Sequence, residues 1–244
     1  MQKKSEDILL KRVMQQLKKG EFTRSLQKLE KLARKYPDNV QIINLKGICH
    51  GLNGQHEEAL FCYERIIELD PNSAMHYNNL GLTHQNLGHY HEALIWFDKA
   101  LSLNPDFLEA RYNRANTYAV LMRTDEAIGE YQEVLQRKGD HHLTLLNLGN
   151  AYVLQGKLQD ALTSYTAAFH AKPGYADAAF NLGHTYEMME CPTEALFWYE
   201  KTLDIDASYL PAWKQKAKIH RNNGEKEEAE ASDFVIASLQ KETT

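Results

Sequence analysis

Apolar residues recur every three to four positions through residues 74–107, which read AMHYNNLGLTHQNLGHYHEALIWFDKALSLNPDF. A first amphipathic run contains residues 79–81, Asn-Leu-Gly, and breaks at Gly88. A second run covers residues 92–103 and ends at Asn104-Pro105. Apolar residues at this spacing predict helices that bury one face, and Gly and Pro interrupt such helices. The stretch therefore predicts two helices joined by a short turn.

The same plan returns at a step of 34 residues, and a fixed internal period of this length is typical of repeat architectures. One small-residue position reads Val13, Gly47, Gly81, Ala115, Gly149, Gly183 and Ala217, and a second reads Ser25, Ala59, Ala93, Ala127, Ala161, Ala195 and Ala229. A third position holds Leu29, Tyr63, Phe97, Tyr131, Tyr165 and Tyr199. Small residues permit two helices to cross closely, and we expect the large ones to fill the remaining space.

Turn residues are equally regular. Gly20, Gly54, Gly88, Gly156 and Gly224 follow the predicted first helices, and Pro37, Pro71, Pro105 and Pro173 follow the second helices. Met122 and Glu190 stand where a turn Gly is expected. The predicted repeats begin at Glu6, Val40, Ala74, Leu108, His142, Ala176 and Leu210. We predict a leader of residues 1–5, with Ser5 as N-cap, and a single domain over residues 6–243. Further N-caps are expected at Asp38-Asn39, at Asn72-Ser73 and at Thr124.

This pattern resembles the tetratricopeptide repeat (TPR), which has a 34-residue period, a helix-turn-helix unit and signature Leu-Gly, Tyr, Ala, aromatic and Pro positions. The resemblance implies an all-α fold, in which about seven helix-turn-helix repeats form a right-handed α-α superhelix, the TPR solenoid. It also implies that the chain binds other proteins.

Composition and charge limit the classes of partner that we expect for this chain. The chain has 28 Lys and Arg residues against 33 Asp and Glu residues and no basic stripe interleaved with aromatics, so we expect no nucleic-acid binding. No run approaches the roughly 20 apolar residues of a membrane helix, and no signal-peptide core is present, so we expect a cytoplasmic protein without membrane insertion. Cys49, Cys62 and Cys191 lack metal spacing, and we expect reduced thiols.

Catalytic and metal-binding motifs are absent from the sequence. It contains no His-x-x-x-His with a nearby carboxylate, no Cys-x-x-Cys, no phosphate loop and no Gly-x-Ser-x-Gly. His50, His84 and His220 occupy a position that holds Tyr in three other copies, which indicates packing. We therefore predict no catalytic residues, no metal, no cofactor and no enzyme activity.

Asparagines recur on the predicted first helices. The sixth position of the repeat reads Lys11, Leu45, Asn79, Asn113, Asn147, Asn181 and Gln215. This row resembles the asparagine ladder of the TPR superhelix in O-linked N-acetylglucosamine transferases, in which the first helices line a concave groove. A carboxamide has donors and an acceptor, which suits the N–H and C=O groups of an extended peptide. The predicted peptide-binding residues are Asn44, Asn78, Asn79, Leu82, Tyr112, Asn113, Asn116, Leu146, Asn147, Asn150, Phe180, Asn181, His184, Lys214 and Lys218.

A second interpretation of the ladder remains open, because Asn-Leu-Gly is also part of the average TPR sequence and can serve solubility or hydrogen bonding within the repeats. The predicted function is a non-catalytic scaffold that binds an extended or helical peptide segment of another protein. The alternatives are the substrate-docking part of a glycosyltransferase-type enzyme and a chaperone for assembly or secretion clients. The sequence indicates neither the partner nor the oligomeric state.

Overall fold

A computed structural model describes the backbone of residues 2–242 and the side chains of residues 10–241. Over these residues the chain forms fourteen α-helices and no strand, which confirms the all-α fold of helical repeats. The chain divides into two compact units, Met1–Leu121 and Met122–Thr244. The boundary falls inside the fourth predicted repeat, and the single domain predicted for residues 6–243 stays a prediction.

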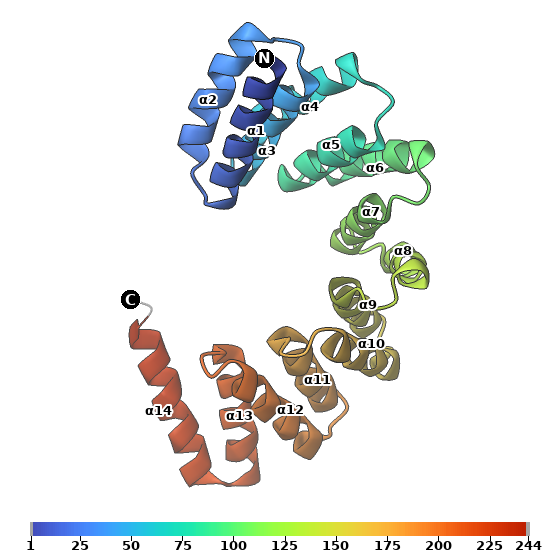
Figure 1. Ribbon diagram of the computed structural model, residues 1–244. Coiled ribbons are helices and arrows are strands. Elements are labelled where there is room, and N and C mark those ends of the chain that lie inside the picture. The colour runs from blue at the N-terminus through green and yellow to red at the C-terminus, as the bar shows by residue number, and fades with distance from the viewer. Residues whose placement is uncertain (1, 243–244) are drawn as a thin grey trace. The chain divides into compact units, whose positions relative to one another are not determined.

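The first unit contains seven helices, each packed against the one before it (Figure 1). Their bounds are α1 Gln2–Lys18, α2 Phe22–Lys35, α3 Val40–Leu52, α4 His56–Leu69, α5 Ala74–Asn86, α6 Tyr90–Leu103 and α7 Leu108–Val120. The first helices of neighbouring repeats also contact one another, since α1 touches α3 and α5 touches α7. Odd-numbered helices are therefore the first helices of the repeats.

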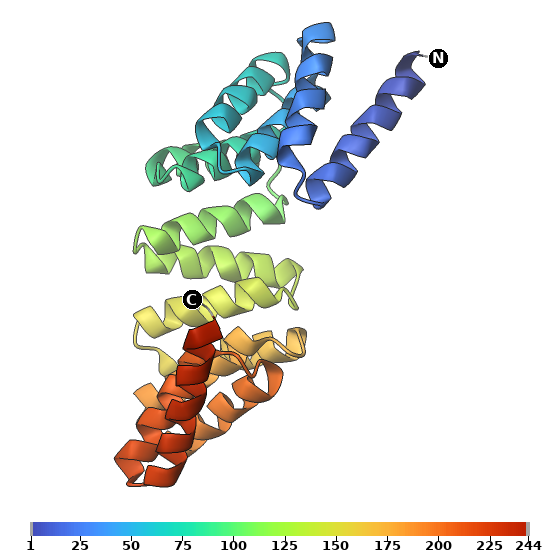
Figure 2. The ribbon, with the colours of Figure 1, turned by 90° about the vertical axis from the view of Figure 1, so that its left-hand side faces the viewer.

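The second unit follows the same plan, and Figure 2 shows its helices from another side. Their bounds are α8 Thr124–Arg137, α9 His142–Leu154, α10 Leu158–Ala171, α11 Ala176–Met188, α12 Pro192–Ile205, α13 Leu210–Asn223 and α14 Lys226–Glu242. Each of these helices packs against the next. In both units the first helices α3, α5, α7, α9, α11 and α13 begin at the residues predicted from the period.

Close helix crossings explain the alternation of small and large residues. A Cβ atom added at Gly47 would lie 2.8 Å from the Tyr63 ring, and one at Gly81 would lie 2.7 Å from the Phe97 ring. Gly149 meets Tyr165 in the same way. These distances are shorter than any normal carbon contact, so only Gly fits at these crossings. The predicted pairing of small and large residues is confirmed at these three repeats.

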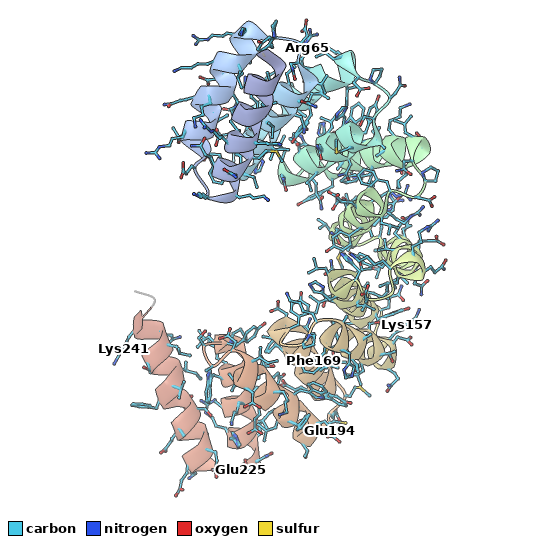
Figure 3. All side chains as sticks on the ribbon, viewed as in Figure 1. Arg65, Lys157, Phe169, Glu194, Glu225 and Lys241 are labelled. Carbon is cyan, nitrogen blue, oxygen red and sulfur yellow. The ribbon has the colours of Figure 1, made fainter. Side chains whose placement is uncertain are left out.

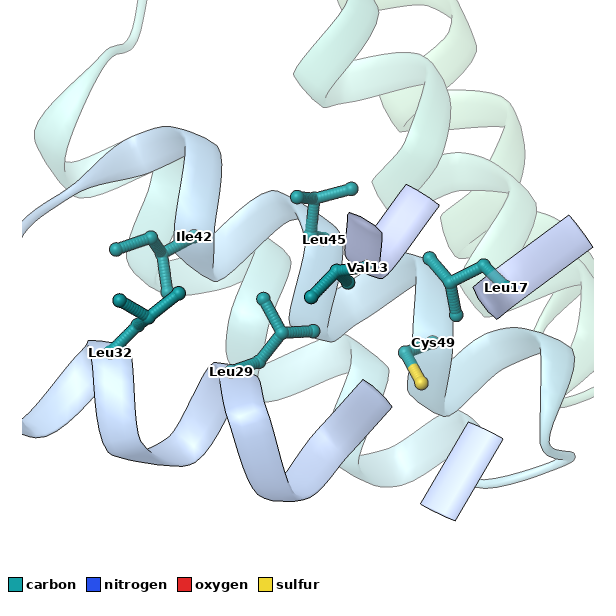
Figure 4. Close-up of a cluster of buried hydrophobic side chains, with 7 residues drawn as sticks. All are labelled: Val13, Leu17, Leu29, Leu32, Ile42, Leu45 and Cys49. Atoms are coloured by element: carbon teal, nitrogen blue, oxygen red, sulfur yellow. The ribbon is translucent and has the colours of Figure 1, made fainter. Parts of the chain in front are cut away.

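Hydrophobic side chains from consecutive helices fill each unit. At the start of unit 1 the core cluster joins α1, α2 and α3 (Figure 4), and its members are Val13, Leu17, Leu29, Leu32, Ile42, Leu45 and Cys49. Because each such cluster draws on adjacent helices only, the core runs along the stack of repeats.

The turns after the first helices use the left-handed backbone conformation. Gly20, Gly54, Gly88, Gly156 and Gly224 all have positive φ, as predicted. Met122 and Glu190, which replace the Gly, keep this conformation with φ of 58° and 59°. A side chain in this region costs roughly 1 to 2 kcal/mol, so the packed helices hold these two turns against local preference.

Helix caps are predicted less well than helix starts. The Asn39 side chain accepts a hydrogen bond from the Ile42 N–H at 3.2 Å, which confirms that cap. Ser73 is the N-cap residue of α5 but makes no side-chain hydrogen bond. Thr124 lies inside α8, because Arg123 takes the cap position. Ser5 lies inside α1, which begins at Gln2, since the preceding Gln and Lys residues are good helix formers.

Candidate peptide-binding faces

The predicted binding residues all lie on first helices, and the structure places them in two groups. Unit 1 holds Asn44, Asn78, Asn79, Leu82, Tyr112, Asn113 and Asn116, and unit 2 holds Leu146, Asn147, Asn150, Phe180, Asn181, His184, Lys214 and Lys218. Within a unit, positions 2, 6, 9 and 13 of a first helix follow helical spacing and form one stripe. We call this stripe the first-helix face.

In unit 1 an asparagine pair is buried between helices. Asn78 of α5 is 1% exposed and Asn113 of α7 is 8% exposed. The Asn113 side chain donates from Nδ2 to Oδ1 of Asn78 at 3.0 Å, and Asn78 Nδ2 approaches the Glu109 carboxylate at 3.4 Å. The expectation that these two side chains face a ligand is wrong, because they satisfy each other between neighbouring repeats.

The other unit 1 residues are more accessible. Asn79 donates to Oδ1 of Asn44 across a long 3.4 Å bond, and both residues are half-buried. Leu82 is exposed, whereas Tyr112 and Asn116 are half-buried. Asn79 and Leu82 therefore remain candidates for ligand contact in this unit.

In unit 2 the asparagine pair lies at the surface. Asn181 of α11 donates from Nδ2 to Oδ1 of Asn150 on α9 at 3.2 Å, and Asn150 is exposed. The Tyr165 hydroxyl, which passes beside Gly149, donates to the same Asn150 oxygen at 2.7 Å. Because two donors occupy this oxygen, the Asn150 amide group is oriented, and its two N–H groups make no hydrogen bond within residues 10–241.

Two apolar residues of unit 2 that were predicted to contact a ligand are partly buried in the core. Leu146 packs against two core clusters formed by its own repeat and the next one. The Phe180 ring lies 5.6 Å from Tyr199 and 5.2 Å from Tyr209. His184 is exposed and stacks on Phe180 at 6.3 Å. Asn147 is half-buried. The sequence pattern placed these residues on the correct helices but did not show which of them are exposed and which pack into the core.

Basic residues mark the α13 end of this face. Lys218 pairs with the Glu187 carboxylate at 2.5 Å, and the buried Tyr199 hydroxyl donates to the same carboxylate at 2.8 Å. Burial opposes ionisation of Glu187, but the hydrogen bonds from Lys218 and Tyr199 outweigh it and hold the pKa of this carboxyl below its usual value. Lys214 is exposed and makes no ion pair within residues 10–241.

Exposed apolar residues on the unit 2 face were missed by the sequence reasoning. Leu143 and Leu154 of α9 and Met188 of α11 are exposed, and Leu154 keeps 56% of its surface. They occupy positions 2 and 13 of the repeat, on the same stripe as Asn150 and Asn181. The available signal was the wholly uncharged sequence of α9, HLTLLNLGNAYVL.

Two features of the described residues concern metal binding and thiol chemistry. Residues 10–241 contain no group of three His, Cys, Asp or Glu side chains placed to hold a metal ion. Burial raises the pKa of the Cys49 and Cys62 thiols, which disfavours the reactive thiolate. Across the described helices, none combines the length and the apolar character needed to span a bilayer.

Family models match three parts of the chain. A model described as tetratricopeptide repeat matches residues 10–74, one described as TPR repeat matches residues 149–189, and one described as anaphase-promoting complex, cyclosome, subunit 3 matches residues 52–134. No curated protein matches the sequence.

Several solved structures share the fold. A tetratricopeptide repeat protein from Parabacteroides merdae is 20% identical with a TM-score of 0.73, and the match covers 97% of this chain and 93% of that one. PilW, a type IV pilus biogenesis factor, is 17% identical with a TM-score of 0.75, covering 83% and 94%. YrrB, described as a TPR protein with an unusual peptide-binding site, is 24% identical with a TM-score of 0.62, and the match covers 77% of this chain and 97% of that one.

Helical hairpins recur every 34 residues in this chain, and Gly–aromatic crossings hold several of them together. This architecture is that of a helical-repeat protein. Within that class, the chain is a tetratricopeptide-repeat protein. Such arrays act as scaffolds for protein–protein interaction.

Proposed function

We propose that the chain is a non-catalytic scaffold and that the first-helix face of unit 2 binds an extended peptide segment of another protein. The observation that carries this proposal is the oriented surface pair Asn150–Asn181. Asn150 presents two N–H donors, and Asn181 keeps one N–H and its carbonyl oxygen beyond the bond between them. This set complements the C=O and N–H groups of a peptide main chain.

Side chains around the pair suit the rest of such a ligand. Leu143, Leu154 and Met188 offer exposed apolar surface on either side of the asparagines. Exposed apolar groups beside polar ones are typical of interaction surfaces. YrrB, which shares the fold, is described as a TPR protein with an unusual peptide-binding site. Main-chain recognition by carboxamides predicts that many side-chain sequences are tolerated.

A display library of random peptides about 12 residues long, roughly 40 Å when extended, tests the proposal. Selected peptides are titrated by calorimetry against the protein and against the double variant Asn150→Ala/Asn181→Ala. We expect affinity to fall about 5- to 150-fold, because two hydrogen-bonding side chains contribute about 0.5 to 1.5 kcal/mol each. The control is Thr163→Ala, an exposed residue of α10 whose hydroxyl bonds only to its own helix.

Single N-methyl groups along the peptide main chain separate this mode of binding from side-chain recognition. At one or two positions an N-methyl group should abolish binding, while replacement of the side chain at the same position should be tolerated. Selection of no peptide, or equal affinity of the double variant with an unchanged circular dichroism spectrum, would refute the proposal.

A further inference from the structure

The turns between the two helices of each repeat share a left-handed residue but differ in the residue before it. Asn precedes it twice, as Asn53-Gly54 after α3 and as Asn223-Gly224 after α13, and both Asn side chains are exposed. Asn followed by Gly is the pair in which the main chain most easily attacks the side chain, because Gly has no Cβ to obstruct the approach. The residues at this position in the other five turns are Lys19, Leu87, Leu121, Gln155 and Met189.

The attack leads to deamidation, a reaction that needs only water. The main-chain nitrogen of the Gly loses its proton and bonds to Cγ of the Asn, while the Cγ–Nδ2 bond breaks and the amide leaves as ammonia. Water then breaks one of the two N–C bonds of the succinimide ring. The product is Asp, or its isomer isoaspartate, in which the main chain continues through Cγ. In either product a carboxylate replaces a neutral amide.

The side chain of Asn53 is held more firmly than that of Asn223. Asn53 donates from Nδ2 to Oε1 of Gln55 at 2.9 Å. Nδ2 of Asn223 reaches Oε1 of Glu225 only at 3.4 Å, which is near the limit of a hydrogen bond. In both turns the Gly N–H donates to a main-chain carbonyl at 3.1 Å, so the attack requires the turn to open locally. The turn that opens more often therefore reacts first.

The helix that follows the α13–α14 turn is weakly anchored. Within residues 226–241 of α14, the buried side chains are the small Ala229 and Ser232. This helix packs chiefly on α13, whereas α4 packs on both α3 and α5 and buries the larger side chains of Tyr63 and Ile66. Because burial of large apolar side chains stabilises a hairpin, we expect the α13–α14 turn to open more readily than the α3–α4 turn.

We propose that Asn223 is a site of spontaneous deamidation in the folded chain, and that its conversion to Asp or isoaspartate loosens the packing of α14 on α13. Glu225 marks this turn in Figure 3, at the opposite end of α14 from Lys241. The proposal concerns the last hairpin of unit 2 and is independent of the peptide-binding face.

The loosening follows from the groups around the new carboxylate. Nδ1 of the buried His220 lies 2.5 Å from the Glu225 carboxylate. Chiefly this hydrogen bond, with a further one from Asn223, holds the pKa of Glu225 below its usual value, so Glu225 is ionised at neutral pH. Deamidation replaces a donor to Glu225 by a like charge, at the C-terminal end of α13 where the helix dipole disfavours negative charge. Isoaspartate also lengthens the main chain beside the left-handed Gly224.

Peptide mapping by mass spectrometry tests the reaction on the full chain, incubated in buffer and sampled over several weeks. We expect Asn223 to gain about 1 Da, at a rate that rises from about pH 6 to about pH 9 because the attacking nitrogen must lose its proton. Asn222 is the matched control, since it is also exposed but precedes a residue with a Cβ. Gln155 precedes Gly156 but must close a larger ring. Asn223 should convert at least about tenfold faster than either control, and faster than Asn53.

Hydrogen exchange on the incubated chain measures the loosening. Amide protection in α14 should fall as Asn223 converts, while the α9–α10 hairpin keeps its protection. Asn223→Asp should reproduce the loss without incubation. Asn223→Gln, which retains an amide but closes the ring slowly, should keep both its mass and its protection. Conversion of Asn223 no faster than that of Asn222, or an Asn223→Asp variant with wild-type protection in α14, would overturn the proposal.

Discussion

The two units can be compared at one asparagine pair each, and both of these pairs join neighbouring first helices. The Asn78–Asn113 pair of unit 1 is buried, whereas in the pair of unit 2 Asn150 is exposed and Asn181 is half-buried. The donors, Asn113 and Asn181, occupy the same repeat position, but their acceptors lie at positions 5 and 9. The comparison teaches that one residue at one repeat position can stabilise the stack or face a ligand, depending on which neighbour it meets.

Removal of the buried pair should have the largest effect. Asn78→Ala should lower the free energy of unfolding by about 2 to 3 kcal/mol, because it leaves the buried Asn113 amide without its acceptor and creates a small cavity. Urea denaturation followed by circular dichroism measures this change. Asn44→Ala is the matched control, since Asn44 holds the same position one repeat earlier, is half-buried and should cost under about 1 kcal/mol. If both variants lost the same free energy of unfolding, burial of Asn78 would not be the cause of the loss.

The tyrosine that orients Asn150 offers a second test. Tyr165→Phe should destabilise unit 2 by about 0.5 to 1.5 kcal/mol, through loss of the hydroxyl bond to Asn150. Phe97 occupies the equivalent position in unit 1, which shows that the ring alone fills the crossing. Thermal unfolding measures the change. Tyr186→Phe is the control, because its hydroxyl makes no hydrogen bond within residues 10–241, and an equal loss there would contradict the assigned role.

The Glu187–Lys218 pair predicts a pH dependence confined to unit 2. Because the folded pKa of Glu187 lies below its usual value of 4.5, its contribution to stability is present above pH 4.5 and is lost as the pH falls through the folded pKa. Glu187→Gln should therefore flatten the fall of the unfolding free energy in acid. Urea denaturation at several acidic pH values measures the slope. Glu194→Gln, an exposed acid of α12, should leave it unchanged, and a similar slope in all three proteins would refute the assignment.

The smallest effect is expected at the surface pair itself. Asn181→Ala should change the free energy of unfolding by less than about 0.5 kcal/mol, since both partners regain water as a hydrogen-bond partner. A urea titration of this variant beside Asn78→Ala measures the contrast directly. A loss at Asn181 as large as that at Asn78 would mean that both pairs are structural and that the unit 2 face has no spare carboxamide.

The fold could be predicted closely because its signals are local and repeat. Six helix starts coincide with the residues read from the 34-residue period, and the Gly–aromatic crossings follow from residue size alone. The candidate site was predicted less well. The period gives the position of Asn78 within its own repeat, but its burial depends on Asn113 and Glu109 from the next repeat. Such contacts depend on how neighbouring repeats stack, and the spacing of residues along one helix carries no information about this stacking.

The exposed sides of α4 and α6 in unit 1 show the same contrast between what could be predicted from the sequence and what could not. Glu57 and Glu58 are exposed, as charged residues on a helix surface usually are. The exposure of Phe61 and Ile95 could not be read from hydrophobicity, since apolar residues usually indicate a core. Comparison of the same position in all repeats, where Gln27 and Thr163 are polar, was the signal that would have found them.

The left-handed turn at Glu190 has a consequence for the order of folding. A hairpin whose turn is locally unfavourable loses roughly 1 to 2 kcal/mol at that turn, and its helix contacts must offset this cost. We therefore expect the α11–α12 hairpin to form later than the α9–α10 hairpin, which turns at Gly156. A single side chain at a turn would thus favour one order of folding in a stack whose repeats are otherwise alike.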